Sequence, residues 1–475
     1  MTDLKINDNE FAGKTVALIG AGVSNMPLVP FFVSRGAAVT VRDSKSREKM
    51  GEKAAAIEEN GARLIAGDGY LGGLTEDIIV RSPGIRPDIP EFASAVSNGS
   101  ILTSEMELFL SHAKCRVYAV TGSDGKSTTT TVLSKLLEGG VGKAYLGGNI
   151  GSPLCHLYPE MTENDRAAVE LSSFQLMTID AEFEAAVVTN VTPNHLNWHT
   201  GMDEYIAAKE RILRRAKRAV LNAGNEVTRG MGERCSCPVT WFSRDPIDDA
   251  ILREGDSAIC LDGGMIVMRD KGKKPVPVLA LSDILLPGLH NAENYMAAIA
   301  AAGDAADAGK IRKVASTFPG VEHRLEFVRE KDGVRYYNGS IDSSPTRTDA
   351  ALSALCVTAR RPITVILGGY DKNIPFAPLA DAVLGRDLVR RAVLNGATAD
   401  AIDKALRDNP LFKKRVADGS FELLRAPSFD EAVLTASQAA ESGETVLLSP
   451  ACASFDQFEN FEERGKRFKE IVRGL

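Results

Sequence analysis

The stretch TGSDGKSTTT, Thr121–Thr130, decides the fold, because it joins an apolar strand to an amphipathic segment through a glycine-rich turn. Glycines let successive backbone N–H groups point toward an anion, and the N-terminus of the following helix adds its dipole. Lys126 is expected to neutralise phosphate charge, and Ser127 to offer its hydroxyl to Mg²⁺. The longer Walker pattern would place a glycine at Val120, so the loop is a shortened variant. The alternative is a strand–helix turn that binds no ligand, but the context favours a phosphate-binding loop.

Two other apolar runs also end in glycines, TVALIGAG at Thr15–Gly22 and ITVILGGYDK at Ile363–Lys372. Apolar strands with glycine-rich turns, alternating with amphipathic stretches, are typical of βαβ units and parallel sheets. The three openings predict three α/β domains. We expect a Rossmann-like domain at 1–112, a central P-loop-type ATPase with a parallel sheet at 113–320, and a Rossmann-like domain at 321–475.

Composition narrows the class of protein. The chain has 475 residues, a net charge of −7 and seven scattered cysteines. An acidic total argues against a broad nucleic-acid-binding surface, and scattered cysteines argue for a reducing compartment. The N-terminus MTDLKINDNEF carries charges where a signal peptide needs an apolar core, and no apolar run approaches the roughly 18 residues of a membrane span. We therefore expect a soluble, cytoplasmic protein that binds no nucleic acid.

The first glycine-rich turn, GAGVS at Gly20–Ser24, resembles part of a dinucleotide fingerprint. Its third glycine is replaced, and Asp43 follows the strand VTVRD at the usual place for a ribose contact. NAD and another nucleotide remain equally open on this pattern. The turn Ser82–Gly84 follows the strand DIIVR and is expected near the same sheet edge, either as a ligand loop or as a plain loop.

Polar residues also follow two strands of the central region, in ELSSFQL at Glu170–Leu176 and NVTPNHLNWH at Asn190–His199. Ligands collect at the carboxyl ends of parallel strands. Glu170 and His195 are therefore candidates to bind Mg²⁺ opposite Lys126, where a metal would offset repulsion between ATP and a carboxylate. Taken alone, His195 is more often a capping residue, and Lys209 in the next helix is more often a solvated charge.

Taken in order, these motifs resemble the Mur ligases, the enzymes that build the peptide of the bacterial cell-wall precursor. The resemblance runs almost from end to end. Its C-terminal part resembles the D-glutamate-adding branch of the family. The motifs that carry it are TGSDGKSTTT, GGNIG at Gly147–Gly151, ELSSFQL, the H-x-x-x-H segment, YIAAKERI at Tyr205–Ile212, GLHNAENYMAA at Gly288–Ala298, GVEHRLEFV at Gly320–Val328, ILGGYDKN at Ile366–Asn373 and LLSPACASFDQFENFEERG at Leu447–Gly465.

The resemblance implies an activity and its participants. It implies ATP-dependent ligation of D-glutamate to UDP-N-acetylmuramoyl-L-alanine through an acyl phosphate, in peptidoglycan precursor synthesis. It implies ATP and Mg²⁺, with two ions, and a carbamoylated lysine at Lys209. The partners are then these small-molecule substrates, and we expect a monomer.

The resemblance also implies roles for particular residues. For catalysis and metal binding they are Lys126, Ser127, Glu170, His195 and the carbamoylated Lys209. For ATP they are Gly122, Ser123, Asp124, Gly125, Lys126, Ser127, Thr128, Asn291, Asn294 and Arg324. For the UDP-acceptor they are Val23, Ser24, Asp43, Ser44, Ser82, Pro83, Gly84, Asn149, Ser172 and Gln175. For D-glutamate they are Lys372, Ser454, Phe455 and Phe461. Without the resemblance, Phe455 and Phe461 are expected in a core, and Ser454 at the start of a helix beginning at Phe455.

The chain departs from the family at two places. Many members have N-D-S-K after the strand that opens the third domain, whereas here Asn338 is followed by Gly339, Ser340 and Ile341. We expect Asp342 to supply the missing carboxylate at the ATP site, with a capping role as the alternative. Asn197 replaces a common aspartate beside His195.

Three other functions remain open from the sequence. One is a ligase of the same family that adds another amino acid, such as L-alanine, or extends a folyl polyglutamate chain, and the C-terminal segment argues against it. Another is a regulatory protein that uses the ATP loop as a switch. The third is an NAD-dependent dehydrogenase, which the first glycine-rich turn alone permits.

Overall fold

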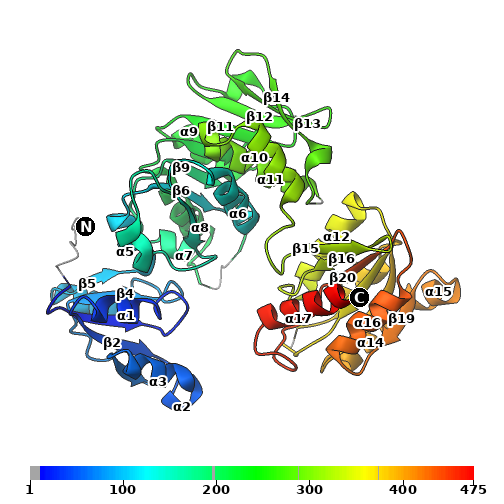
Figure 1. Ribbon diagram of the computed structural model, residues 1–475, viewed down its shortest axis with the longest axis horizontal. Coiled ribbons are helices and arrows are strands. Elements are labelled where there is room, and N and C mark those ends of the chain that lie inside the picture. The colour runs from blue at the N-terminus through cyan, green and yellow to red at the C-terminus, as the bar shows by residue number, and fades with distance from the viewer. Residues whose placement is uncertain (1–10, 195–197, 287, 373) are drawn as a thin grey trace. The chain divides into compact units, whose positions relative to one another are not determined.

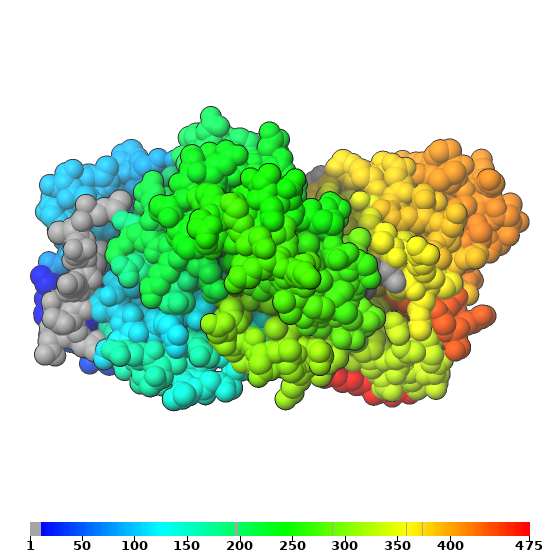
Figure 2. Space-filling model, turned by 90° about the horizontal axis from the view of Figure 1, so that it is seen from above, coloured from blue at the N-terminus to red at the C-terminus, as the bar shows by residue number. Residues whose placement is uncertain are grey.

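The computed structural model describes residues 11–194, 198–286, 288–372 and 374–475. The chain forms two compact units, one containing residues up to Leu281 together with Glu293–Val314, the other containing Ser282–Ala292 and Ala315–Leu475. The first unit holds two β-sheets and the second holds one (Figure 1). On the surface each band of the colour gradient broadly stays together (Figure 2), as expected when each sheet is built from one stretch of chain.

The N-terminal sheet has five parallel strands in the order β3-β2-β1-β4-β5. Because the strand order reverses between β1 and β4, the loops after these two strands flank a crevice at the carboxyl edge of the sheet. The strands are β1 Thr15–Ile19, β2 Ala38–Asp43, β3 Arg63–Ala66, β4 Ile78–Arg81 and β5 Ile101–Thr103. The helices are α1 Leu28–Val33, α2 Arg47–Met50, α3 Glu52–Glu59, α4 Pro90–Ser97 and α5 Glu105–His112.

The central sheet has nine strands in the order β14-β13-β12-β11-β10-β9-β6-β8-β7. The strands from β7 to β12 pair in parallel, and β13 and β14 add an antiparallel edge. The strands are β6 Arg116–Thr121, β7 Ala144–Gly148, β8 Arg166–Glu170, β9 Ala185–Val188, β10 Ala219–Asn222, β11 Val239–Ser243, β12 Ser257–Asp262, β13 Met265–Asp270 and β14 Val276–Ala280. The helices are α6 Lys126–Leu137, α7 Ser173–Leu176, α8 Met202–Glu210, α9 Glu226–Arg234, α10 Leu289–Ala302 and α11 Ala308–Thr317.

The inner strands of the central sheet are buried on both faces, which is why β9 is the uninterrupted apolar run Ala185–Val188. The first two sheets also share a hydrophobic core, since Phe31 of α1 and Phe109 of α5 belong to the same buried cluster as Tyr158. The rings of Phe31 and Tyr158 meet edge to face at 5.8 Å. This shared core explains why the two sheets form one unit.

The third sheet has six strands in the order β15-β16-β20-β17-β18-β19, all parallel except β15 at the edge. Because β20 inserts between β16 and β17, the loops after these three strands are neighbours at one edge. The strands are β15 Glu326–Lys331, β16 Val334–Asn338, β17 Ile363–Leu367, β18 Val389–Leu394, β19 Glu422–Arg425 and β20 Thr445–Leu448. The helices are α12 Pro345–Thr358, α13 Ala377–Leu384, α14 Ala399–Asp408, α15 Phe412–Ala417, α16 Phe429–Ala439 and α17 Phe461–Gly474.

The expected architecture of three α/β domains is confirmed, and the helix predicted after the glycine-rich loop is α6. One local alternative is wrong: no helix begins at Phe455. The next helix, α17, begins at Phe461, because the side chain of Asn460 accepts a hydrogen bond from Glu463 N and caps it. Among the described residues, no helix combines the length and the apolar character that crossing a membrane requires.

Candidate active site

The glycine-rich loop connects β6, an inner strand between β9 and β8 of the nine-stranded sheet, to α6. Gly125 stands just before α6 with φ +79°, a left-handed conformation that glycine adopts without strain. A Cβ there would collide with the side-chain amide of Asn294 on α10. Asn294 Oδ1 also accepts a hydrogen bond from Thr129 Oγ1 at 3.2 Å. A glycine at this point is therefore required by close packing as well as by the backbone turn.

The loop after β9 holds the glycine-rich loop in shape. Asp124 N donates to Asn190 Oδ1 at 2.9 Å, and Ser123 Oγ donates to the carbonyl of Thr192 at 3.0 Å. Ser123 Oγ also lies 2.9 Å from the hydroxyl of Tyr205 on α8. Lys126 Nζ donates to the carbonyls of Gly122 and Ser123, both at 2.9 Å. Lys126 is thus folded back over the glycine-rich loop, where phosphate is expected to bind.

Glu170 stands at the end of β8, beside the loop. Its side chain is buried, and one oxygen, Oε1, accepts a hydrogen bond from Asn149 Nδ2 at 3.1 Å. The other oxygen, Oε2, is buried without a hydrogen-bond partner among the described residues. Such an atom is costly unless a ligand satisfies it, and a carboxylate oxygen is a preferred ligand of Mg²⁺. The unpartnered oxygen of Glu170 is therefore suited to bind a magnesium ion, for which Ser127 at the start of α6 is another candidate ligand.

Lys209 is the buried amine of the site. It lies on α8 and is 1% exposed, and its Nζ donates to the carbonyl of Gly122 at 2.7 Å. Burial, reinforced by the charge of Lys126, lowers the pKa of Lys209 to about 6. The amine is therefore mainly neutral at pH 7, and the solvated helix charge considered from the sequence alone is wrong.

Two other expected contacts of the central domain are engaged within the protein. Ser172 and Gln175 form a capping box at the start of α7, in which Gln175 N donates to Ser172 Oγ and Ser172 N donates to Gln175 Oε1. These bonds give both residues a structural role, and they also fix the loop that follows Glu170. His195 and Asn197 lie outside the described residues.

The residues expected to bind the UDP-acceptor in the first domain lie at the carboxyl ends of β1, β2 and β4. Val23 is 76% exposed in the loop after β1, which leaves its side chain open to a ligand. Asp43 is occupied by the backbone, because its two oxygens accept hydrogen bonds from Ala21 N and Lys45 N, both at 2.8 Å. Ser44 in the loop after β2, and Ser82, Pro83 and Gly84 in the loop after β4, are partly or fully exposed.

In the second unit, the residues expected to bind D-glutamate follow β17 and β20. Lys372 Nζ donates to Ser343 Oγ at 2.9 Å, in the loop after β16. Phe455 is 63% exposed and meets Tyr370 edge to face at 5.9 Å. An exposed aromatic pair beside a cation at this edge is open to a ligand, so the expectation that Phe455 lies in a core is wrong. Ser454 is buried, and Phe461 packs against His323 at 6.0 Å.

Asp342 is buried in the same edge. Its Oδ2 accepts a hydrogen bond from Ser449 Oγ at 2.9 Å, and burial raises its pKa to about 7. The same oxygen lies 2.5 Å from the place that a Cβ on Gly339 would occupy. Asp342 therefore fills the space that a larger side chain at Gly339 would need. Arg324 lies near enough to act on Asp342 electrostatically, and Asn291 is buried on α10.

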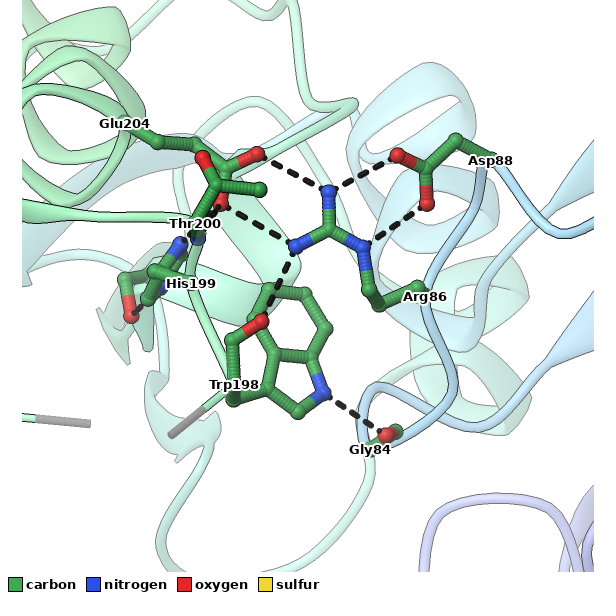
Figure 3. A network of polar contacts seen from close by, with 8 residues as sticks. Gly84, Arg86, Asp88, Trp198, His199, Thr200 and Glu204 are labelled. Carbon is green, nitrogen blue, oxygen red and sulfur yellow. Dashed lines mark hydrogen bonds and ion pairs between the residues drawn. The ribbon is translucent and has the colours of Figure 1, made fainter. Parts of the chain in front are cut away.

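A polar network that the sequence analysis missed joins the first two domains (Figure 3). Arg86 follows the Ser82–Gly84 turn, and its guanidinium binds both oxygens of Glu204 on α8, at 2.9 and 3.1 Å. Trp198 Nε1 donates to the carbonyl of Gly84 at 2.9 Å. No local pattern predicts these contacts, because 118 positions separate Arg86 from Glu204 along the chain. The one local hint of these contacts was Trp198, a large side chain with an N–H donor in the segment NHLNWH.

Comparisons with known proteins identify the family of the chain. The Mur ligase middle domain matches residues 120–302, and the Mur ligase glutamate ligase domain matches residues 323–452. The chain belongs to the Mur ligase family. Relatives from Clostridium novyi, Clostridium perfringens and Acetivibrio thermocellus are each 43% identical over 99% of this chain and at least 99% of their own length. All three are UDP-N-acetylmuramoylalanine–D-glutamate ligases.

Solved structures share the fold at lower identity. A UDP-N-acetylmuramate-alanine ligase from Thermotoga maritima matches with a TM-score of 0.58 and 17% identity, covering 97% of this chain and 99% of that one. A UDP-N-acetylmuramoyl-L-alanyl-D-glutamate–2,6-diaminopimelate ligase matches with a TM-score of 0.55 and 15% identity, covering 92% of each chain. These likenesses support the three-domain fold.

Proposed function

We propose that this chain ligates D-glutamate to UDP-N-acetylmuramoyl-L-alanine with hydrolysis of ATP to ADP and phosphate, in the synthesis of peptidoglycan precursors. The observation that carries this proposal is 43% identity, over the whole length, to ligases of this specificity. The match of the glutamate ligase domain to residues 323–452 agrees with it. The alternatives of an NAD dehydrogenase and of a nucleotide switch have no support among these relatives.

The reaction proceeds in two displacements. A carboxylate oxygen of the L-alanine end attacks the γ-phosphorus of ATP, the bond to the bridging oxygen breaks, and ADP leaves. The amine of D-glutamate then attacks the carbonyl carbon of the acyl phosphate, the C–O bond breaks, and phosphate leaves as the nitrogen loses a proton. The backbone N–H groups of Gly122–Thr128 and the ammonium of Lys126 stabilise the charge on the transferred phosphoryl group.

Ser127, Glu170 and His195 are proposed to hold Mg²⁺, which, when bound, offsets the repulsion between the attacking carboxylate and ATP. We further propose that Lys209 is carbamoylated. A neutral amine is the form that adds CO₂, and the burial of Lys209 beside Gly122 keeps its amine neutral. The carbamate would replace a neutral amine with an anion next to Glu170 and the phosphate loop.

The remaining residue assignments are proposals of the same kind. Asn291, Asn294, Arg324 and Asp342 would contact ATP. The UDP-acceptor would bind to Val23, Ser24, Asp43, Ser44, the Ser82–Gly84 turn, Asn149, Ser172 and Gln175. D-Glutamate would bind to Lys372, Ser454, Phe455 and Phe461. Asp43, Ser172 and Gln175 already bond within the protein, so they would contribute through backbone geometry or through their remaining polar atoms.

The setting of the enzyme is proposed as well. We infer a cytoplasmic monomer with domains at 1–112, 113–320 and 321–475. The ends of α5 at His112 and α11 at Thr317 support the two boundaries. The substrates are nucleotides and an amino acid, and the two proposed Mg²⁺ ions accompany ATP.

A screen of amino acids for phosphate release tests the function. The purified chain is mixed with ATP, Mg²⁺ and UDP-N-acetylmuramoyl-L-alanine, and D-glutamate is compared with L-glutamate, L-alanine and glycine. We expect release of phosphate with D-glutamate alone, and loss of that release in Lys126→Ala by on the order of 10²–10³-fold. Phosphate release that needs neither the acceptor nor an amino acid would favour a nucleotide switch instead.

A further inference from the structure

The two domains of the first unit are joined by a forked ion pair that is largely buried. Arg86 binds Glu204 with two parallel hydrogen bonds, and it also binds Asp88 through Nε at 2.8 Å and Nη2 at 2.7 Å. About one fifth of each of the Arg86 and Glu204 side chains is exposed. This pair lowers the pKa of Glu204 to about 2, chiefly through the hydrogen bonds from Arg86. A guanidinium that serves two carboxylates in forked geometry cannot be replaced by a lysine without loss of bonds.

The arginine also fixes the position of Trp198. Arg86 Nη1 donates to the carbonyl of Trp198 at 2.9 Å, and its guanidinium lies 5.0 Å from the centre of the indole ring. The indole in turn donates to the carbonyl of Gly84, in the turn proposed to hold the UDP-acceptor. Figure 3 shows Arg86 between Asp88, Glu204 and Trp198, with Gly84 below the indole. The Ser82–Gly84 turn and Arg86 are therefore both held against the central domain, through Trp198 and Glu204.

The contacts of Glu204 and of its neighbours on α8 extend toward the phosphate loop. Glu204 is followed on α8 by Tyr205, whose hydroxyl contacts Ser123, and one turn later by Lys209. Its Oε2 also faces His199 Nδ1 at 3.0 Å, and His199 Nε2 lies 2.9 Å from Ser173 Oγ, three residues beyond Glu170. A short chain of direct contacts thus runs from the acceptor turn to the residues proposed to surround ATP and Mg²⁺.

From these contacts we infer that Arg86 is a positioning residue, which sets the acceptor turn against α8 so that the acceptor carboxylate meets the phosphate loop. The inference rests on the proposed function for the identity of the acceptor. A reacting group misplaced by about 1 Å can cost as much as 10²-fold in rate. The Arg86–Glu204 pair is well suited to prevent such a displacement, because the two residues belong to different domains.

If the Arg86–Glu204 pair only stabilised the fold, its removal would affect the use of all substrates alike. The chain offers a matched control at the other end of α8, where Arg234 binds both oxygens of Glu210 at 2.9 and 3.1 Å. That pair lies within the central domain and has no part in the acceptor turn. Arg234→Ala therefore reports what the loss of a forked ion pair on α8 does by itself.

The test compares Arg86→Ala, Arg86→Lys, Glu204→Gln and Arg234→Ala in the full chain, by kinetics and by calorimetric binding of UDP-N-acetylmuramoyl-L-alanine. In Arg86→Ala we expect kcat/KM for the acceptor to fall between tenfold and a hundredfold, roughly, while the KM for D-glutamate stays within about twofold. Arg86→Lys should recover part of the loss. Arg234→Ala should match the wild type. Adding Glu204→Gln to Arg86→Ala should cost less than the two single losses together, because the residues act as a pair.

The inference is overturned if kcat/KM and binding of the acceptor in Arg86→Ala equal those of the wild type. It is also overturned if kcat/KM falls equally for all substrates, in proportion to a loss of thermal stability. Failure of the proposed function is a separate result, because it appears in the wild type as turnover that does not need D-glutamate. In that case calorimetry still decides the inference, since weaker binding of the UDP-acceptor in Arg86→Ala than in Arg234→Ala supports it and equal binding refutes it.

Discussion

At the scale of single residues, the site contains buried ionisable groups with shifted pKa values or an unpaired oxygen, as functional sites often do. Glu170 leaves one carboxylate oxygen without a protein partner, and Lys209 is held neutral beside the loop. Asp342 is a buried acid placed against Gly339. Buried groups with displaced pKa values collect at functional sites, because a structural role is met more cheaply by apolar side chains.

Replacing Lys209 by alanine should reduce ligation by on the order of 10²–10³-fold, because it removes the proposed anion beside the metal. Acetate or formate should restore part of the activity by occupying the vacated space. Addition of ¹³C-bicarbonate to the wild type should give a carbamate signal in the ¹³C NMR spectrum, and the signal should be absent in Lys209→Ala. A variant as active as the wild type, or a wild type without the signal, contradicts carbamoylation.

Replacing Asp342 by asparagine should change how stability depends on pH. Because the folded pKa is raised to about 7, the native state keeps a proton that the unfolded state releases between about pH 4 and 7. Stability of the wild type therefore falls as the pH rises through that window, and a neutral side chain removes this loss. We expect Asp342→Asn to gain on the order of 2 kcal/mol relative to the wild type between pH 5 and 8.

Urea unfolding at several pH values measures this difference, and the KM for ATP in the same variant reports on the site. A changed KM together with the altered pH profile supports a contact with the nucleotide. If the KM is unchanged, Asp342 only fills the space beside Gly339.

At the scale of elements, helices begin where the chemistry is placed. Helix α6 starts directly behind the phosphate loop, α7 starts behind Glu170, and α8 carries Tyr205 and Lys209 to the loop. Helix α6 is preceded by a glycine in the left-handed conformation, and α7 begins with a capping box. The helix starts therefore determine where the functional side chains can lie.

Gly125→Ala tests the role of the loop–helix junction. The alanine is disfavoured at φ +79° and also collides with Asn294. Gly139→Ala, just beyond the other end of α6, is a matched control, because Gly139 has φ +76° and no atom within 4 Å of a Cβ. Both should lose on the order of 1–2 kcal/mol of stability from the backbone. The KM for ATP should rise in Gly125→Ala alone. An equal KM in both variants would show that the Asn294 contact is unimportant for the nucleotide.

At the scale of the whole molecule, the residues proposed to bind the three substrates are spread over the three sheets. Each presents its candidate residues at the carboxyl ends of its parallel strands, where topology leaves room for a ligand. The proposed assignment places most acceptor residues on the first sheet, most ATP residues on the second and the D-glutamate residues on the third. Asn149, Ser172 and Gln175 of the central domain also serve the acceptor, and Arg324 and Asp342 of the third domain also serve ATP. Binding the substrates on separate domains makes their affinities separable by mutation.

Lys372→Ala should raise the KM for D-glutamate by about tenfold or more, because a dicarboxylate loses a fixed cation. Calorimetric affinity for the UDP-acceptor should stay unchanged. Lys413→Ala, an exposed lysine on α15, serves as the control for a general loss of positive charge on that domain. A loss of acceptor affinity with normal use of D-glutamate would contradict the division between sheets.

The sequence by itself determined the fold class, the phosphate loop and the family. The fold class and the loop follow from local patterns, because an apolar strand, glycines at fixed spacing and an amphipathic helix act on neighbouring residues, as in TGSDGKSTTT. The family follows from the ordered series of motifs along almost the whole chain. The specificity for D-glutamate was also predicted from C-terminal motifs, and relatives of that specificity at 43% identity over the whole length support it.

Only the tertiary structure decided the state of particular side chains. The burial of Lys209, the bonds that occupy Asp43, the approach of Asp342 to Gly339 and the joining of Arg86 to Glu204 depend on strands and loops brought together from distant positions. Phe455 was expected in a core because aromatic residues are usually buried. Instead it lies exposed in the loop after β20, at the edge of the sheet. The physical reason is common to all of them: desolvation and hydrogen bonding depend on the neighbours of a side chain in space, and the sequence lists only its neighbours along the chain.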